Sequence, residues 1–168
     1  MLNAKDATQS TKHRILILGN TGSGKTTQIL TLPGKKYVHI FDQNALLSLR
    51  GFDLDYDEYM PDTIGMAATS MTKGKGDKSA STASESYRRF ETEFNERLQN
   101  GFFDSYEWVC FDGASTLLDL AMDRVLTING RFGTWPHQDD HGPCMIAFTN
   151  ICRNLTALGK SVYMTGHL

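Results

Sequence analysis

Arg14-Ile15-Leu16-Ile17-Leu18 leads directly into Gly19-Asn20-Thr21-Gly22-Ser23-Gly24-Lys25-Thr26, which matches the phosphate-loop pattern G-x-x-x-x-G-K-[ST] over its whole length. Glycines in such a loop let the backbone curl, so that successive N–H groups point at phosphate oxygens before the chain enters the positive end of a helix. In this pattern Lys25 reaches the β and γ phosphates, and the Thr26 hydroxyl binds Mg²⁺. We therefore expect a nucleoside triphosphate to contact Gly19, Asn20, Thr21, Gly22, Ser23, Gly24, Lys25, Thr26 and Thr27.

Apolar runs that alternate with helical patterns continue along the whole chain. The predicted strands are Arg14–Leu18, Tyr37–Phe41, Trp108–Phe111 and Ser161–Thr165. The predicted helices are Gly24–Thr31, Ser84–Gln99, Ser115–Leu126 and Met145–Leu158, and Asn44–Leu49 is helical or turn-like. We expect a solvated surface segment over Asp53–Asp62, which has five acids and no base, and a loop over Thr127–Pro143. This alternation predicts an α/β fold: a three-layer, doubly wound, mainly parallel sheet of the P-loop nucleotide-binding type.

The bulk properties predict one domain over residues 1–168, with a polar tail at 1–12 and a flexible loop at 65–84. The net charge of −2 provides no global attraction to nucleic acid, so any DNA contact needs a local patch. The compact basic stretch is Lys73–Lys78, for which a solvated linker is the alternative. Three cysteines fit no disulfide or zinc spacing, and the polar start resembles no signal peptide. We expect a soluble cytoplasmic protein with no membrane segment.

A second nucleotide motif follows the third predicted strand. The four apolar residues Trp108–Phe111 are followed by Asp112. In P-loop proteins an aspartate at this end of a strand holds Mg²⁺ together with the threonine of the phosphate loop, here Thr26. The alternative is that Asp112 caps the next helix, although Ser115 is available for that task.

Hydrolysis also needs a carboxylate that orients or deprotonates the attacking water. We favour Asp42, at the end of the second strand, over Asp119 and Asp123, which lie on a predicted helix. The alternative for Asp42 is a plain turn residue. His167, at the end of the fourth strand, is a candidate sensor of the γ phosphate, and the alternative is a solvated histidine. The predicted catalytic residues are Lys25, Asp42, Asp112 and His167.

Two further features suggest a function, and each has a non-functional alternative. His137 and His141, with Cys144 close by, suggest a metal site, but Pro136, Gly142 and Pro143 argue against a regular helix there, and we prefer solvated loop residues. Arg131 lies in a loop between strands and is a candidate arginine finger for a neighbouring subunit, against the default of a surface arginine.

The order of these motifs resembles the RecA-like phage and plasmid nucleotide-binding proteins, a group of small P-loop ATPases. The resemblance covers most of Arg14–Leu168 and rests on Gly19–Thr26, Tyr37–Gly51, Trp108–Gly113 and Gly159–His167. It implies that the protein binds ATP and Mg²⁺, assembles into oligomers and works on DNA, including single-stranded DNA. The choice of ATP over GTP rests on this resemblance.

The chain departs from the group's pattern in two places. Asn44 stands where RecA-like proteins often have a catalytic glutamate, so hydrolysis would be slow or would rely on Asp42. Such folds place the fourth strand between the first and third and add a strand beyond the first, whereas this sequence stops at Leu168. We expect either a fragment or a homo-oligomer or partner chain that covers the apolar edge of Arg14–Leu18, because an uncovered edge invites self-association.

Three functions follow from these observations. The first is an ATPase that couples hydrolysis to phage-type DNA recombination, replication or other DNA handling. The second is a nucleotide-binding assembly module with little turnover, which Asn44 favours. The third is a small-molecule phosphotransferase, which would need an arginine-bearing lid, and Gly65–Ser84 contains no arginine.

Overall fold

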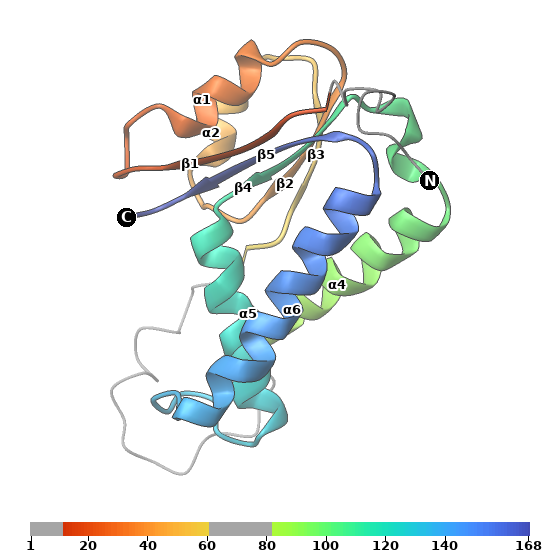
Figure 1. Ribbon diagram of the computed structural model, residues 1–168. Helices are drawn as coiled ribbons and strands as arrows, with labels where there is room; N and C mark the ends of the chain where they lie inside the picture. Colours follow the sequence, from red (N-terminus) through yellow and green to blue (C-terminus); the bar gives the residue numbers. More distant parts are fainter. Residues whose placement is uncertain (1–11, 61–81) are drawn as a thin grey trace, which may run out of the picture.

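The fold is built on a parallel sheet with helices on both faces (Figure 1). The computed structural model describes residues 12–60 and 82–168. Within these residues the strands are β1 (Arg14–Leu18), β2 (Lys36–Ile40), β3 (Asp55–Glu58), β4 (Trp108–Asp112) and β5 (Ser161–Gly166). Their order is β1-β5-β4-β2-β3, and each neighbouring pair is parallel. The predicted doubly wound α/β fold is confirmed, and the last strand lies between the first strand and the strand that ends in Asp112, as expected.

The helices form the two outer layers. One face of the sheet is covered by α1 (Lys25–Gln28), a 3₁₀ turn (Ile29–Thr31) and α2 (Ala45–Leu49). The other is covered by α4 (Thr82–Gln99), α5 (Ala114–Ile128) and α6 (Gln138–Ala157), and a second 3₁₀ turn spans Phe102–Ser105. Figure 1 shows the short helices above the sheet and the three long ones below it. The layers explain why the central strands are apolar at consecutive positions, since each faces a core on both sides.

Strand alternation divides the buried residues between two cores. In β2, Val38 and Ile40 pack toward α1 and α2, whereas Tyr37 packs toward the long helices. In β4, Cys110 faces the first core and Phe111 the second. The predicted helix Ser84–Gln99 is confirmed as α4. The aromatic residues that repeat along it at helical spacing are buried; they are Tyr87, Phe90 and Phe94.

The prediction of a solvated segment at Asp53–Asp62 was wrong in part: Asp53, Asp55 and Tyr56 are exposed, but the segment is an edge strand that leads to a buried tyrosine, and residues 61–62 lie outside the described residues. Four of its residues form β3, which pairs with β2 at the sheet edge, and Tyr59 just beyond it is fully buried. The acids are tolerated because they have partners from other elements: Asp55 pairs with Lys35, and Asp57 pairs with Arg97 and accepts a hydrogen bond from Tyr37. Acidic composition indicated solvent, but these ion pairs and hydrogen bonds cannot be read from the local sequence.

The predicted loop Thr127–Pro143 was wrong in its second part, because α6 begins at Gln138 and contains Pro143. Asp140 stabilises this start. Its carboxylate accepts the backbone N–H of His137 at 2.7 Å and the side-chain amide of Asn129 at 3.0 Å, and it pairs with Arg131. Pro143 is the sixth residue of α6, beyond the first four N–H groups that have no intrahelical partner, so it removes one hydrogen bond from the helix and the contacts of Asp140 help to offset that loss.

Other boundaries differ slightly from the predictions. The helix after the phosphate loop is α-helical only to Gln28 before it tightens into the 3₁₀ turn. The end of the predicted loop 65–84 belongs to α4, which begins at Thr82. The rest of that loop, Lys73–Lys78 included, and residues 1–11 of the polar tail lie outside the described residues.

The edge strand β1 leaves apolar side chains in solvent. Leu16 is 59% exposed, Leu18 51% and Ile15 36%, and within the described residues β1 pairs only with β5. Among residues 12–60 and 82–168, no helix has the length and apolar character needed to cross a membrane.

Candidate functional site

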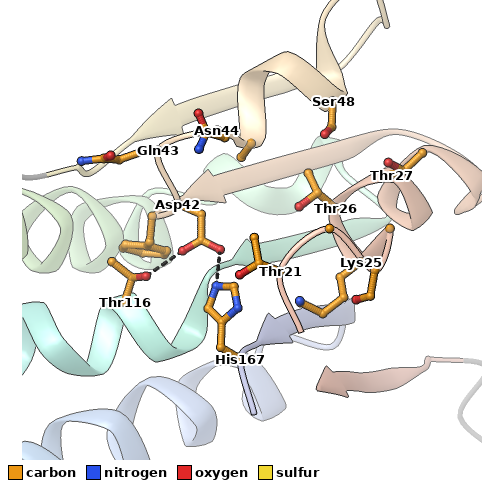
Figure 2. A pocket seen from close by; sticks show the side chains of 15 residues that line it. Thr21, Lys25, Thr26, Thr27, Asp42, Gln43, Asn44, Ser48, Thr116 and His167 are labelled. Atoms are coloured by element: carbon orange, nitrogen blue, oxygen red, sulfur yellow. Dashed lines mark hydrogen bonds and ion pairs between the residues drawn. The ribbon is translucent and has the colours of Figure 1, made fainter. Parts of the chain in front are cut away.

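A cavity of about 570 Å³ lies at the carboxyl ends of the strands, where ligands bind in open α/β sheets (Figure 2). The phosphate loop forms one side, and the segment after β2 forms the other. The lining residues are Thr21, Gly22, Ser23, Gly24, Lys25, Thr26, Thr27, Phe41, Asp42, Gln43, Asn44, Ala45, Ser48, Thr116 and His167. Seven of the nine residues predicted to bind nucleotide therefore line the cavity, together with Asp42 and His167.

The remaining two, Gly19 and Asn20, hold the lysine of the loop. Lys25 Nζ donates hydrogen bonds to the Gly19 carbonyl at 2.7 Å and to the Asn20 carbonyl at 2.9 Å, and the residue is only 7% exposed. Gly24 precedes α1 with φ +83°, a conformation that residues with a Cβ rarely adopt. Among the described residues the ammonium forms no ion pair with a carboxylate, so its charge is available to an anion in the cavity.

Asp112 lies behind Thr26 and is fully buried. Thr26 Oγ1 donates to both carboxylate oxygens of Asp112, at 2.8 and 3.0 Å, and Thr165 Oγ1 donates to Oδ1 at 2.6 Å. Burial raises the pKa of Asp112, and the hydrogen bonds from Thr165 and Thr26 oppose that rise. A hydroxyl and a carboxylate are the hard oxygen ligands that Mg²⁺ prefers, so this pair fits the cation. The alternative of a helix cap was wrong, since Gly113 occupies the N-cap of α5.

Asp42 and His167 meet across the end of β4 (Figure 2). His167 Nε2 lies 3.0 Å from Asp42 Oδ2, and Thr116 Oγ1 donates to Asp42 Oδ1 at 2.6 Å. Gly113 makes this approach possible, because a Cβ at that position would lie 2.6 Å from Asp42 Oδ1. Its φ of +98° also favours glycine.

The other candidate residues lie elsewhere. Asp119 and Asp123 are on α5, but neither lines the cavity; burial, followed by the charge of Asp119, raises the pKa of Asp123 to about 6. Arg131 pairs with Asp140 at the far end of α5 from Gly113, so within one chain it does not reach the phosphate loop. A role toward a neighbouring subunit stays a prediction.

The stretch His137–Cys144 was considered as a metal site and was expected not to form a regular helix. Most of it lies in α6, so that structural expectation was wrong. Cys144 is buried, and Asp140 is occupied by Arg131 and Asn129. Within the described parts of the chain, no group of three or more His, Cys, Asp or Glu side chains could hold a metal ion.

Three residues of the site were not predicted from the sequence. Thr165 bridges Asp112 and the Gly113 N–H, which donates to Thr165 Oγ1 at 2.9 Å. Thr116 binds Asp42, and Ser115 Oγ accepts the backbone N–H of His167 at 2.9 Å. Their position offered a signal, since all three lie within four residues of a strand end that carries a predicted site residue.

Comparison with known protein families gives a match over nearly the whole chain. A family model described as AAA domain matches residues 11–168. The comparison with curated proteins found no match. The match spans the phosphate loop, the strand that ends in Asp112 and the strand before His167.

Proposed function

The chain belongs to the AAA domain family of nucleotide-binding P-loop ATPases, and from this premise we propose that it binds ATP at Gly19–Thr27 and hydrolyses it with Mg²⁺. The observation that carries the proposal is the buried Lys25, whose ammonium lies beside a cavity of about 570 Å³. The cavity lies within the size range of small-molecule sites. Lys25 would contact the β and γ phosphates, while N–H groups of the loop bind phosphate oxygens.

Thr26 and Asp112 would hold Mg²⁺. The bound ion would neutralise charge that develops on the phosphates during transfer. The two side chains are already in contact through hydrogen bonds of 2.8 and 3.0 Å, and Thr165 holds the carboxylate from the other side. These contacts support the proposal because they bring the Thr26 hydroxyl and the Asp112 carboxylate together beside the phosphate loop.

Asp42 would orient the attacking water, and His167 would donate a hydrogen bond to the γ phosphate. Both side chains are partly exposed to the cavity. Asn44 also lines it and cannot accept a proton as a glutamate would, which favours slow turnover. The second candidate function, a nucleotide-gated assembly module, takes its support from this residue.

We further propose that turnover serves phage-type DNA recombination or replication. The support is the resemblance of the motifs to the phage and plasmid group. With a net charge of −2 the contact requires a local basic patch, and Lys73–Lys78 is the candidate. ATP turnover with and without single-stranded DNA, at two salt concentrations, tests this. Equal rates, together with no salt-dependent DNA binding, would contradict it.

We also propose that another protein chain, a second copy in the first instance, covers the β1 edge. The exposed Leu16 borders a mostly apolar groove of about 190 Å³ between β1 and α6, lined partly by Leu155 and Met164. The opposite edge strand, β3, carries three acids, and charged side chains protect an edge from pairing. The two edges therefore differ in their tendency to pair.

The decisive experiment measures ATP hydrolysis with and without Mg²⁺, in parallel with binding of a non-hydrolysable ATP analogue. Lys25→Ala should lose both activities, whereas Lys160→Ala, a surface lysine bonded to the Asp104 carbonyl, should keep them. Binding without turnover in the unmodified chain would favour the assembly module. Full analogue affinity in Lys25→Ala would refute the assignment of the loop.

A further inference from the structure

We infer that Thr116 is a positioning residue for hydrolysis, because its hydroxyl fixes the carboxylate of Asp42 that in turn holds His167. The inference rests on the proposed ATPase function. It adds to that function a residue that would not itself touch the reacting atoms.

The carboxylate of Asp42 is held at both oxygens. Oδ1 accepts the Thr116 hydroxyl at 2.6 Å, and Oδ2 lies 3.0 Å from His167 Nε2 (Figure 2). Rotation of the Asp42 carboxylate about the Cβ–Cγ bond would break one or both of these contacts. Each oxygen still has a second lone pair, so Asp42 can accept a hydrogen bond from water in this fixed orientation.

The first turn of α5 is the element that sets this arrangement. Thr116 binds the residue after β2, and its neighbour Ser115 binds the backbone N–H of His167 after β5. Ser115 and Thr116 follow Asp112 by three and four residues. One helical turn therefore connects Asp112, the predicted metal ligand, with Asp42 and His167. Position matters here because a displacement of about 1 Å from reactive geometry costs about 100-fold in rate.

A purely structural role makes a different prediction. If Thr116 only tied α5 to β2, its loss would lower stability and leave the kinetics of the folded protein unchanged. If it orients Asp42, kcat should fall while the KM for ATP stays nearly constant, because the contacts of the phosphate loop and Lys25 do not involve Thr116.

The test compares Thr116→Val and Thr116→Ser with Thr127→Val. Thr127 is the matched control, since it lies on the same helix, is partly buried and donates its hydroxyl to the Asp123 carbonyl. We expect Thr116→Val to lower kcat at least about tenfold with KM within about twofold, and Thr116→Ser to restore most of the rate. Thr127→Val should match the unmodified chain. Thr116→Ala, with the residue best suited to a helix, serves if Thr116→Val does not fold.

A double-mutant cycle adds a second readout. If Thr116 acts through the Asp42–His167 contact, adding Thr116→Val to His167→Gln should lower kcat much less than Thr116→Val does alone. A kcat for Thr116→Val equal to that of Thr127→Val, or additive effects in the cycle, would overturn the inference alone. Failure of the unmodified chain to bind the ATP analogue, or to turn ATP over, would overturn the proposed ATPase and the role of Thr116 with it.

Discussion

We expect His39→Leu to remove much of the acid sensitivity of folding. His39 is fully buried in β2, and the nearest ring centroids are those of Phe111 at 4.7 Å and Tyr37 at 4.9 Å. Neither imidazole nitrogen has a hydrogen-bond partner among the described residues. A buried base without a partner strongly disfavours its charged form.

The magnitude follows from the pKa. Burial, followed by the positive charge of Arg97, lowers the pKa of His39 from 6.5 to about 3. As the pH falls, His39 binds a proton in the unfolded chain before it does so in the folded chain. The contribution of neutral His39 to the free energy of unfolding is therefore fully present above pH 6.5 and is lost progressively down to about pH 3. The full difference corresponds to about 5 kcal/mol, of which about 2 kcal/mol is lost by about pH 5.

The assay is urea unfolding followed by circular dichroism at several pH values between about 7.5 and 4.5. Leucine is close to histidine in volume, but it loses ring contacts, so the informative quantity is the slope of stability against pH within each variant. His141→Gln, on the exposed side of α6, is the control and should keep the slope of the unmodified chain. Equal slopes for His39→Leu and the unmodified chain would refute the reasoning.

Three further substitutions test the site and the sheet edge. Gly113→Ala should abolish turnover, because the added Cβ would lie 2.6 Å from Asp42 Oδ1. Gly133→Ala is the control, since its φ is +77° but no atom lies within 4 Å of the added Cβ. This control should lower the free energy of unfolding by only about 1 kcal/mol. Thr165→Val should lower the urea unfolding free energy by about 1–3 kcal/mol, since it leaves the Gly113 N–H and one Asp112 oxygen without that partner; an unchanged midpoint would count against it. Leu16→Lys should reduce self-association in sedimentation velocity, because a charge on an edge strand opposes pairing, and an unchanged distribution would show that the β1 edge is not the contact.

The elements that could be predicted are those whose signal is local. Four strands are apolar at consecutive positions, and α4 repeats aromatic residues at helical spacing, so both patterns survive in any tertiary context. The start of α6 could not be predicted, because it depends on the ion pair of the buried Asp140 with the partly exposed Arg131. This contact outweighs the local effect of Pro143. Strand β3 was missed for the same reason, since two of its three acids, Asp55 and Asp57, are neutralised by partners from other elements.

The candidate site divides in the same way. By itself the sequence determined the phosphate loop, because its glycines, Lys25 and Thr26 act through local backbone geometry. Asp42, Asp112 and His167 could be identified separately as residues at strand ends. Only the tertiary structure decided that they converge, because the order β5-β4-β2 places two of these ends on either side of the third, and Gly113 leaves room between them. The role inferred for Thr116 depends on that convergence, since its hydroxyl reaches Asp42 from a helix 74 positions further along the chain.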